Sequence, residues 1–144
     1  MDQPSKYPTT FYRVSVKALI TNEAGQVLVV KENQDTWSLP GGGLDHGEQP
    51  HDGLTREIKE ELGVELSQNL QLLTTRTFYL PGKQAWLMWI VYQATLPPDT
   101  TFTFGEGVTA AEFIGVRQLD ANDLFEGLVA TLLTELSEGA TLEQ

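Results

Sequence analysis

The sequence contains no cysteine. This absence excludes disulfide frameworks, thiolate metal sites and a thiol nucleophile, although it leaves the redox compartment open. Long apolar runs are also missing, because the longest covers only residues 86–92, whereas a membrane-spanning helix needs about 18 apolar residues. The first residues, MDQPSKYPTTFYR, lack the apolar stretch of a secretory signal. We therefore expect a protein that is neither exported nor embedded in a membrane.

Basic residues are scarce as well. Nine Lys and Arg oppose twenty Asp and Glu, which gives a net charge of −11. Such a surface repels phosphate backbones, so polymeric DNA or RNA is not expected as a partner. The acidic excess is concentrated in residues 41–65, which hold seven acids and two bases. A solvated surface explains most such runs, but a divalent metal site also gathers carboxylates, and their spacing has to decide.

The sequence does contain enough apolar material for a core. Hydrophobic residues make up 40% of the 144 residues, which excludes disorder as the default, and the length predicts a single domain over residues 1–144. Alternating, β-branched and aromatic residues predict five strands. These strands cover residues 11–20, 26–31, 70–80, 84–95 and 112–116.

The segments between the strands complete the outline. Turn residues at 21–25 predict that the first two strands form a hairpin, and Pro81-Gly82-Lys83 predicts a turn between the next two. Residues 101–110 are typical of a loop. Leucines at four-residue spacing predict an amphipathic helix over residues 120–136.

A second helix is predicted over residues 50–62. Pro50 suits its first turn, where the missing N–H would be unpaired, and Gly63 suits the position just after its end. An apolar stripe runs between them, formed by Leu54, Ile58 and Leu62. With this helix in place, the order of elements predicts an α/β (α+β) fold, in which helices pack on a mixed sheet.

The other side of this helix is acidic. Glu57 and Glu61 lie one turn apart on the same face, and Glu60 sits close by. Like charges at this spacing repel one another, and Arg56 and Lys59 offset only part of the repulsion. A hard divalent cation such as Mg²⁺, which takes oxygen ligands, would explain the arrangement.

Three glycines, Gly41–Gly43, stand shortly before the helix. Without side chains, they let backbone groups approach a ligand closely. The segment is not a P-loop, because the closing Lys-Ser/Thr is absent, and it does not match the dinucleotide-binding fingerprint. A glycine-rich loop beside an acidic metal face suits a phosphate ester whose charge the metal neutralises.

These residues together carry a resemblance to a known family. Gly42 is followed after five residues by Glu48, and after seven more by an unbroken run. The run is Arg56-Glu57-Ile58-Lys59-Glu60-Glu61-Leu62-Gly63-Val64. This pattern resembles a complete Nudix box, the signature of the Nudix hydrolases, and Trp37-Ser38-Leu39-Pro40-Gly41 resembles its usual lead-in. Seven fixed and two aliphatic positions arise by chance on the order of 10⁻⁸ per chain of this length.

The resemblance implies both a fold and a chemistry. It implies a Nudix-type α/β/α sandwich over nearly the whole chain, with helices on both faces of a mixed sheet. Nudix enzymes use Mg²⁺, with Mn²⁺ as a substitute, to hydrolyse the diphosphate of a nucleoside diphosphate linked to another group. The expected partner is therefore a small-molecule nucleotide, either a nucleoside diphosphate derivative or a nucleoside triphosphate. The resemblance also leaves room for a homodimer and, by analogy, implies a cytoplasmic protein.

The resemblance also assigns roles to residues. The metal ligands would be the carbonyl of Gly41 and the carboxylates of Glu57, Glu60 and Glu61. Arg56 would orient these carboxylates through a pair with Glu48. Structural support of the site would come from Gly42, Glu48 and Gly63.

The general base stays open at this point. It would be a box glutamate such as Glu57 or a glutamate from a downstream loop. Glu106 is favoured among the downstream candidates, because it lies between glycines in the expected loop. Glu112 is more typical of the start of the following strand.

The sequence also bears on two other functions. Isopentenyl diphosphate isomerases have a similar fold but use a cysteine, which this chain lacks. A non-catalytic nucleotide-binding Nudix module is the alternative to a hydrolase, although such modules tend to have lost box glutamates that are present here.

The substrate is left open. Residues 79–82 contain a proline, which in this family hints at ADP-ribose, and a tyrosine, which hints at diadenosine polyphosphates, but neither stands at a decisive distance from the box. Candidates for stacking on a base are Trp37, Phe78, Tyr79, Trp86 and Trp89. Candidates for binding phosphate are Arg13, Lys17, Arg76, Lys83 and Arg117, each of which alone is typical of surface charge.

Overall fold

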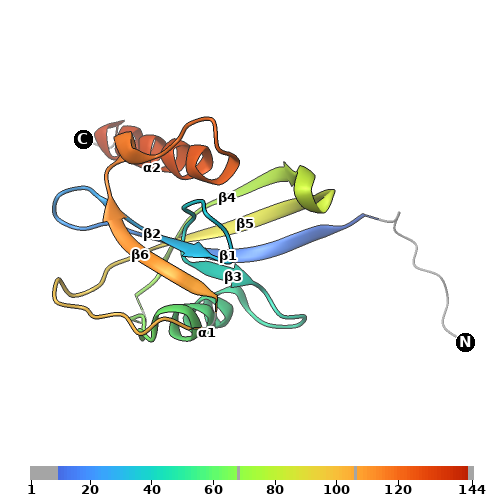
Figure 1. Cartoon of the computed structure of the whole chain (residues 1–144), viewed down its shortest axis with the longest axis horizontal. Coiled ribbons are helices and arrows are strands. Elements are labelled where there is room, and N and C mark those ends of the chain that lie inside the picture. The colour runs from blue at the N-terminus through green and yellow to red at the C-terminus, as the bar shows by residue number, and fades with distance from the viewer. Residues whose placement is uncertain (1–9, 68, 106, 143–144) are drawn as a thin grey trace, which may run out of the picture.

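Two helices enclose two sheets in the computed structural model, which describes residues 10–67, 69–105 and 107–142 (Figure 1). The strands are β1 (Tyr12–Ile20), β2 (Val27–Glu32), β3 (Gly41–Gly43), β4 (Gln71–Leu80), β5 (Ala85–Ala94) and β6 (Val108–Ile114). The helices are α1 (Pro50–Leu62) and α2 (Leu124–Leu142), and two short 3-10 turns are η1 (Pro81–Lys83) and η2 (Val116–Gln118).

The larger sheet is mixed, as the sequence predicts. Its strand order is β3-β1-β5-β4, with β1 parallel to β5 and the other pairs antiparallel. A second sheet consists of β2 and β6, which run antiparallel. The predicted α/β (α+β) class with a mixed sheet and helices is therefore confirmed, whereas the extent of the domain over residues 1–144 stays a prediction.

The predicted hairpin between the first two strands is wrong. Strand β1 uses one edge for β3 and the other for β5, so neither edge is left for β2. Thr21 and Val27 form only an isolated bridge, and β2 pairs with β6 instead. Alternating apolar residues identify a strand but not its partner, and Val27–Val30 are buried on both faces because β2 lies between two packed layers.

Each helix covers its own core. Helix α1 packs on one face of the β1 strand, against Val16, Ala18 and Ile20. Helix α2 packs on the opposite face, where Leu19 and Trp89 belong to a second core. Figure 1 shows the two helices on opposite sides of the strands. Because the side chains of β1, β2 and β5 alternate between the two cores, these strands link the two halves of the molecule.

Several predicted boundaries need correction, among them the end of the last helix, which lies at Leu142 rather than at residue 136. Strand β6 begins at Val108, inside the stretch expected to be a loop, because pairing with β2 outweighs the weak strand preference of Ala110 and Ala111. Helix α2 begins at Leu124 rather than at 120, because the Asp123 carboxylate accepts the backbone N–H of Glu126 (3.0 Å) and so caps the helix. Within the described residues, no helix is both long and apolar enough to cross a bilayer.

Candidate active site

Local sequence signals define the helix that carries the acidic side chains. Pro50 occupies the first turn of α1, and Gly63 ends it in the left-handed conformation (φ 67°) with its N–H donating to the carbonyl of Lys59 (3.0 Å). The predicted stripe of Leu54, Ile58 and Leu62 is fully buried against β1 and β2. Burial of the stripe fixes the rotation of the helix, and this rotation directs Glu57 and Glu61 toward β3.

Arg56 is bound to Glu48 by two hydrogen bonds. Its Nε donates to Oε2 of Glu48 (2.8 Å) and its Nη2 to Oε1 (2.9 Å). The hydrogen bond from Arg56 holds the pKa of the Glu48 carboxyl at about 2, and the backbone N–H of Asp45 contributes to the same effect. Arg56 also donates to the carbonyl of Gly43 (3.2 Å), so this pair ties the glycine loop to α1.

This pair predicts a pH-dependent stability. The pKa of Glu48 lies below its ordinary value of 4.5 in the folded protein, so ionised Glu48 stabilises the fold above that pH and the contribution is lost as pH falls toward 2. We expect Glu48→Gln to lower Tm at neutral pH, with the gap to the wild type closing between pH 4.5 and pH 2. Thermal scans across this range measure the gap.

Glu65→Gln is the matched control, because Glu65 also pairs with a base, Lys59, but both side chains are exposed. Its Tm should stay close to that of the wild type. A Glu48→Gln variant that melts like the wild type at neutral pH would contradict the stabilising role of the pair.

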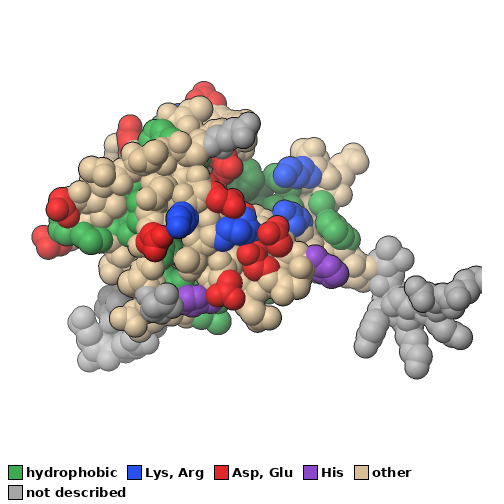
Figure 2. Space-filling view, turned by 90° about the horizontal axis from the view of Figure 1, so that it is seen from below, with side chains coloured by type: hydrophobic (Ala, Val, Ile, Leu, Met, Phe, Trp, Pro, Cys, Tyr) green, Lys and Arg blue, Asp and Glu red, His purple; other side chains and the backbone are tan. Residues whose placement is uncertain are grey.

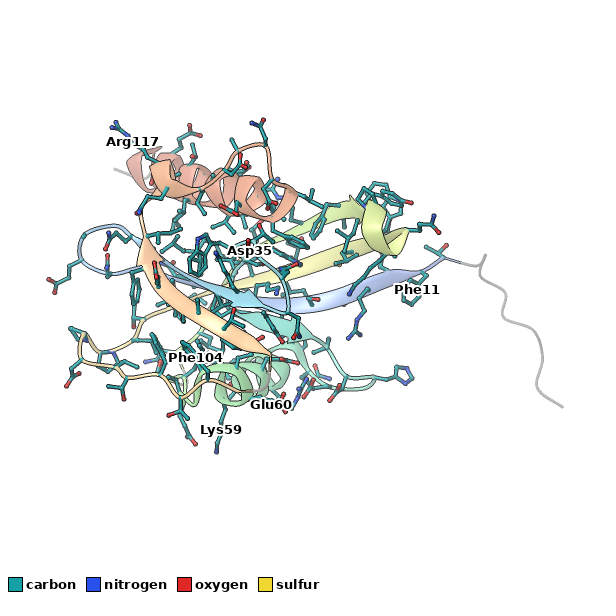
Figure 3. The ribbon with its side chains drawn as sticks, in the orientation of Figure 1. Phe11, Asp35, Lys59, Glu60, Phe104 and Arg117 are labelled. Atoms are coloured by element: carbon teal, nitrogen blue, oxygen red, sulfur yellow. The ribbon has the colours of Figure 1, made fainter. Side chains whose placement is uncertain are left out.

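The same arginine contacts two of the predicted metal ligands. Nη1 of Arg56 donates to Glu57 (3.0 Å) and to Glu60 (3.2 Å). The Glu57 side chain is 15% exposed and that of Glu60 is 59% exposed. Burial raises the pKa of Glu57, and Arg56 opposes the shift. Figure 3 labels Glu60 and its neighbour Lys59 on α1.

Gly42 leaves room for the Glu57 carboxylate. A Cβ at Gly42 would lie 2.5 Å from Oε2 of Glu57, so any larger residue would push this carboxylate away. Figure 2, which views the molecule from the side of α1, shows acidic side chains gathered around basic ones near the middle of that face.

Glu61 is the most deeply buried acid of the site. It is only 4% exposed, and its Oε2 accepts the backbone N–H of Gly41 (2.9 Å). Its Oε1 is buried and has no hydrogen-bond partner among the described residues. Burial, together with the neighbouring Glu32 carboxyl, raises the pKa of Glu61 to about 9. A buried carboxylate oxygen without a partner is costly unless a ligand completes it.

The predicted ligands do not form one ready-made cluster. Among residues 10–67, 69–105 and 107–142, no group of three or more acidic or histidine side chains is arranged to hold a metal. Glu57 and Glu60 are turned toward Arg56, whereas Glu61 is turned toward Gly41. The donor set nevertheless fits a hard divalent cation, because it offers carboxylate and carbonyl oxygens, including the Oε1 of Glu61 that no described residue contacts by a hydrogen bond.

Two further charged residues lie at the site. Lys17 was only one of five candidates for phosphate binding, yet its Nζ lies 3.4 Å from the carbonyl oxygen of Gly41. Glu32, at the end of β2, was not predicted at all. It follows Leu28 and Val30 on the strand face that packs toward α1, so the alternation of this strand could have placed it beside Glu61.

A cavity of about 600 Å³ opens beside these groups. Lys17, Glu32, Gly41 and Gly42 line its polar side, and its apolar wall includes Trp89. Another cavity, of about 650 Å³, lies away from the acidic helix near Phe113. Its lining contains no Lys or Arg, so it is poorly suited to a phosphate compound.

The structure sorts the aromatic candidates for base stacking. Trp89 is 1% exposed and lines the cavity, with its ring against those of Phe78 and Phe125. Trp86 and Tyr79 are exposed and pack on each other next to η1, which joins β4 to β5. The remaining candidate, Trp37, contacts the ammonium of Lys31.

The basic candidates for phosphate binding are sorted as well. Only Lys17 and Lys83 among them line the cavity. Arg13 donates to the carbonyl of Leu44, and Arg76 pairs with Glu135. Arg117 lies beside α2, on the side of the molecule opposite to α1 (Figure 3).

The loop after β5 is fastened to the end of α1. The N–H groups of Thr103 and Gly105 donate to the carbonyls of Leu62 (2.9 Å) and Glu61 (2.8 Å), which have no partner within the helix. The favoured base, Glu106, lies outside the described residues. Glu112 lies within β6, where it pairs with Val29 and is exposed, in keeping with the strand interpretation.

Comparisons with known proteins identify relatives of this chain. A family model described as NUDIX domain matches residues 11–133. An RNA pyrophosphohydrolase of Pseudomonas fluorescens is 44% identical over 63 residues, which are 43% of this chain and 39% of that protein. The chain thus aligns with less than half of the length of this curated relative.

Solved structures share the fold over most of the chain. The MutT protein from Methanosarcina mazei is 20% identical, with a TM-score of 0.76 over 93% of this chain and 99% of its own. An ADP-ribose pyrophosphatase from Streptococcus suis is 22% identical, with a TM-score of 0.62 over 88% of this chain and 92% of its own. At these identities the likeness shows the fold alone.

Proposed function

Since this chain belongs to the NUDIX domain family, we propose that it is a divalent metal-dependent hydrolase of a phosphoanhydride bond in a nucleotide derivative. The observation that carries the proposal is the buried Oε1 of Glu61, which has no hydrogen-bond partner in the part of the chain that the structure describes, while Oε2 of the same carboxyl accepts the N–H of Gly41. An oxygen-preferring cation would complete it. The family generally uses divalent metal ions, and we propose Mg²⁺, with Mn²⁺ as its substitute.

The proposed ligands are the carbonyl of Gly41 and the carboxylates of Glu57, Glu60 and Glu61. The bound ion would polarise phosphoryl oxygens and lower the pKa of a water molecule. Arg56 holds Glu57 and Glu60 in place and is itself held by Glu48. Arg56 and Glu48 are therefore proposed to position the ligands rather than to contact the substrate.

In the proposed reaction, the oxygen of water forms a bond to one phosphorus while the bridging P–O bond to the other phosphate breaks. The proton lost by the water passes to a carboxylate, and the leaving phosphate takes the bond electrons. Glu57 is one candidate base, since burial raises its pKa toward the range in which a base works well. Glu106 is the other candidate.

We propose a small nucleotide as the substrate rather than an RNA chain. A cavity of about 600 Å³ is of the size that holds a small ligand, and the net charge of −11 repels a polyanion. The names of the two enzyme relatives, an RNA pyrophosphohydrolase and an ADP-ribose pyrophosphatase, make both substrate classes worth testing. A cytoplasmic location is part of the proposal, and a homodimer stays a prediction.

A substrate panel tests the proposal. The purified chain is incubated with ADP-ribose, dinucleoside polyphosphates, nucleoside triphosphates and 5′-triphosphorylated RNA, each with Mg²⁺ and with EDTA. We expect cleavage of a small nucleotide to a nucleoside monophosphate, abolished by EDTA. Cleavage of the RNA end alone would contradict the small-molecule assignment. Tight nucleotide binding without any turnover would contradict the hydrolase and favour the non-catalytic module.

A further inference from the structure

Lys17 occupies an unusual place for a lysine. It lies in the middle of β1, directly opposite Gly41 of β3. The residue is half-buried and lines the cavity. Its Nζ lies 3.3 Å from the carbonyl oxygen of Leu39 and 3.4 Å from that of Gly41, and it donates to both. Both contacts are long for a charged hydrogen bond, so backbone carbonyls alone do not account for the position of the ammonium.

Carboxylates account for the rest. Glu61, Glu32 and Glu57 all act electrostatically on Lys17, and they come from two separate elements, α1 and β2. Burial disfavours the charged form of Lys17, and these acids oppose that effect. Lys17 therefore supplies positive charge close to these carboxylates, in addition to the charges of Arg56 and Lys83.

The carbonyl oxygen of Gly41 has two roles that compete with each other. In the structure this oxygen accepts a hydrogen bond from the ammonium of Lys17, whereas in the proposed function it is a ligand of the metal ion. Two cations cannot share this oxygen without strong repulsion. The geometry points to Lys17 as a tethered cation that occupies the position beside the Gly41 carbonyl oxygen before the metal binds; this inference rests on the proposed function. A divalent ion then displaces the ammonium into the cavity, toward a substrate phosphate.

The cavity offers room for this movement. The ammonium lies 5.2 Å from the centre of the Trp89 ring, and the wall beyond it includes Lys83 and Ser38. The Ser38 hydroxyl is buried without a hydrogen-bond partner among the described residues. A phosphate there would give the hydroxyl a partner and would balance the charge of both lysines. The lysine thus exchanges carboxylates and carbonyls for a substrate anion.

Metal affinity gives the first test. Mn²⁺ binding is measured by calorimetry in the absence of nucleotide for the wild type, Lys17→Met and Lys17→Gln, two neutral variants of similar length. Because the competing cation is gone, both variants should bind Mn²⁺ about tenfold more tightly. Lys83→Met is the matched control, since it removes one positive charge from the same cavity without a contact to Gly41. Its affinity should change less than about twofold.

Fluorescence of Trp89 gives the second test. In a Trp37→Phe/Trp86→Phe background, Trp89 is the only tryptophan left of the three. Titration with Mg²⁺, which does not itself quench, should change the Trp89 emission when Lys17 is present and leave it unchanged in Lys17→Met. Steady-state kinetics should show a raised KM for the nucleotide in Lys17→Met, because the phosphate loses its cation.

The outcomes separate the two proposals. Equal Mn²⁺ affinities in the wild type and the Lys17 variants, or an equal rise in Lys83→Met, would overturn the role of Lys17 and leave the hydrolase intact. An emission change that persists in Lys17→Met would overturn the displacement. Absence of Mn²⁺ binding in every protein would overturn the proposed function itself, and the role of Lys17 with it.

Discussion

Glu61→Gln is expected to lower kcat roughly 10²–10³-fold while leaving the melting temperature unchanged. Glutamine matches glutamate in size and shape, so the packing around this buried side chain is kept. The amide oxygen can still accept the N–H of Gly41. The substitution therefore preserves the fold but removes the negative charge that a divalent cation needs.

The measurement compares turnover of the best nucleotide from the substrate panel with a thermal scan of the same samples. Glu65→Gln, an exposed acid beyond the end of α1, controls for the loss of one charge and should retain full activity. Activity near the wild-type level in Glu61→Gln would remove Glu61 from the metal site. A large drop in Tm would instead assign it a structural role.

The second large effect is expected from Gly105→Ala. A Cβ at this position would lie 1.9 Å from the carbonyl oxygen of Glu60, a backbone atom that the helix holds in place. The loop would have to move off α1 and would lose the hydrogen bonds from Thr103 and Gly105 to the last turn. We expect a loss of about 3 kcal/mol in the free energy of unfolding, together with reduced turnover.

Urea denaturation of the wild type and of Gly105→Ala measures the difference in the free energy of unfolding. Gly115→Ala is the matched control, since a Cβ there would meet nothing closer than 3.8 Å and the backbone φ of −82° suits alanine. Its stability should stay within about 0.5 kcal/mol of the wild type. If Gly105→Ala proves equally stable, the loop is not packed against α1 as described.

The features that depend on neighbours in the chain could be predicted from the sequence. Helix α1 begins and ends at the predicted residues, because its first-turn proline, apolar stripe and terminal glycine act locally. Family membership followed from the same stretch, since the spacing from Gly42 to Val64 is itself the signature.

The features that depend on distant pairing could not be predicted. The parallel pairing of β1 with β5 joins segments about seventy residues apart, and no local pattern encodes it. The same pairing places Lys17 beside the ring of Trp89, which turned one candidate among five into a residue of the site. The strand alternation that directs Glu32 toward α1 was visible in the sequence. That Glu61 would lie beside Glu32 was not, because the two residues meet only in the folded chain.

The alternation of β1 between two cores has a consequence for how such a protein can diversify. The carboxylates proposed to bind the metal are carried by α1 and belong to one half of the molecule, whereas Trp89 and Phe125 shape the cavity from the other half. Substitutions around α2 can therefore change the shape of the cavity while the carboxylates on α1 stay as they are. New substrate preferences are accessible by mutation of one layer while the other stays fixed.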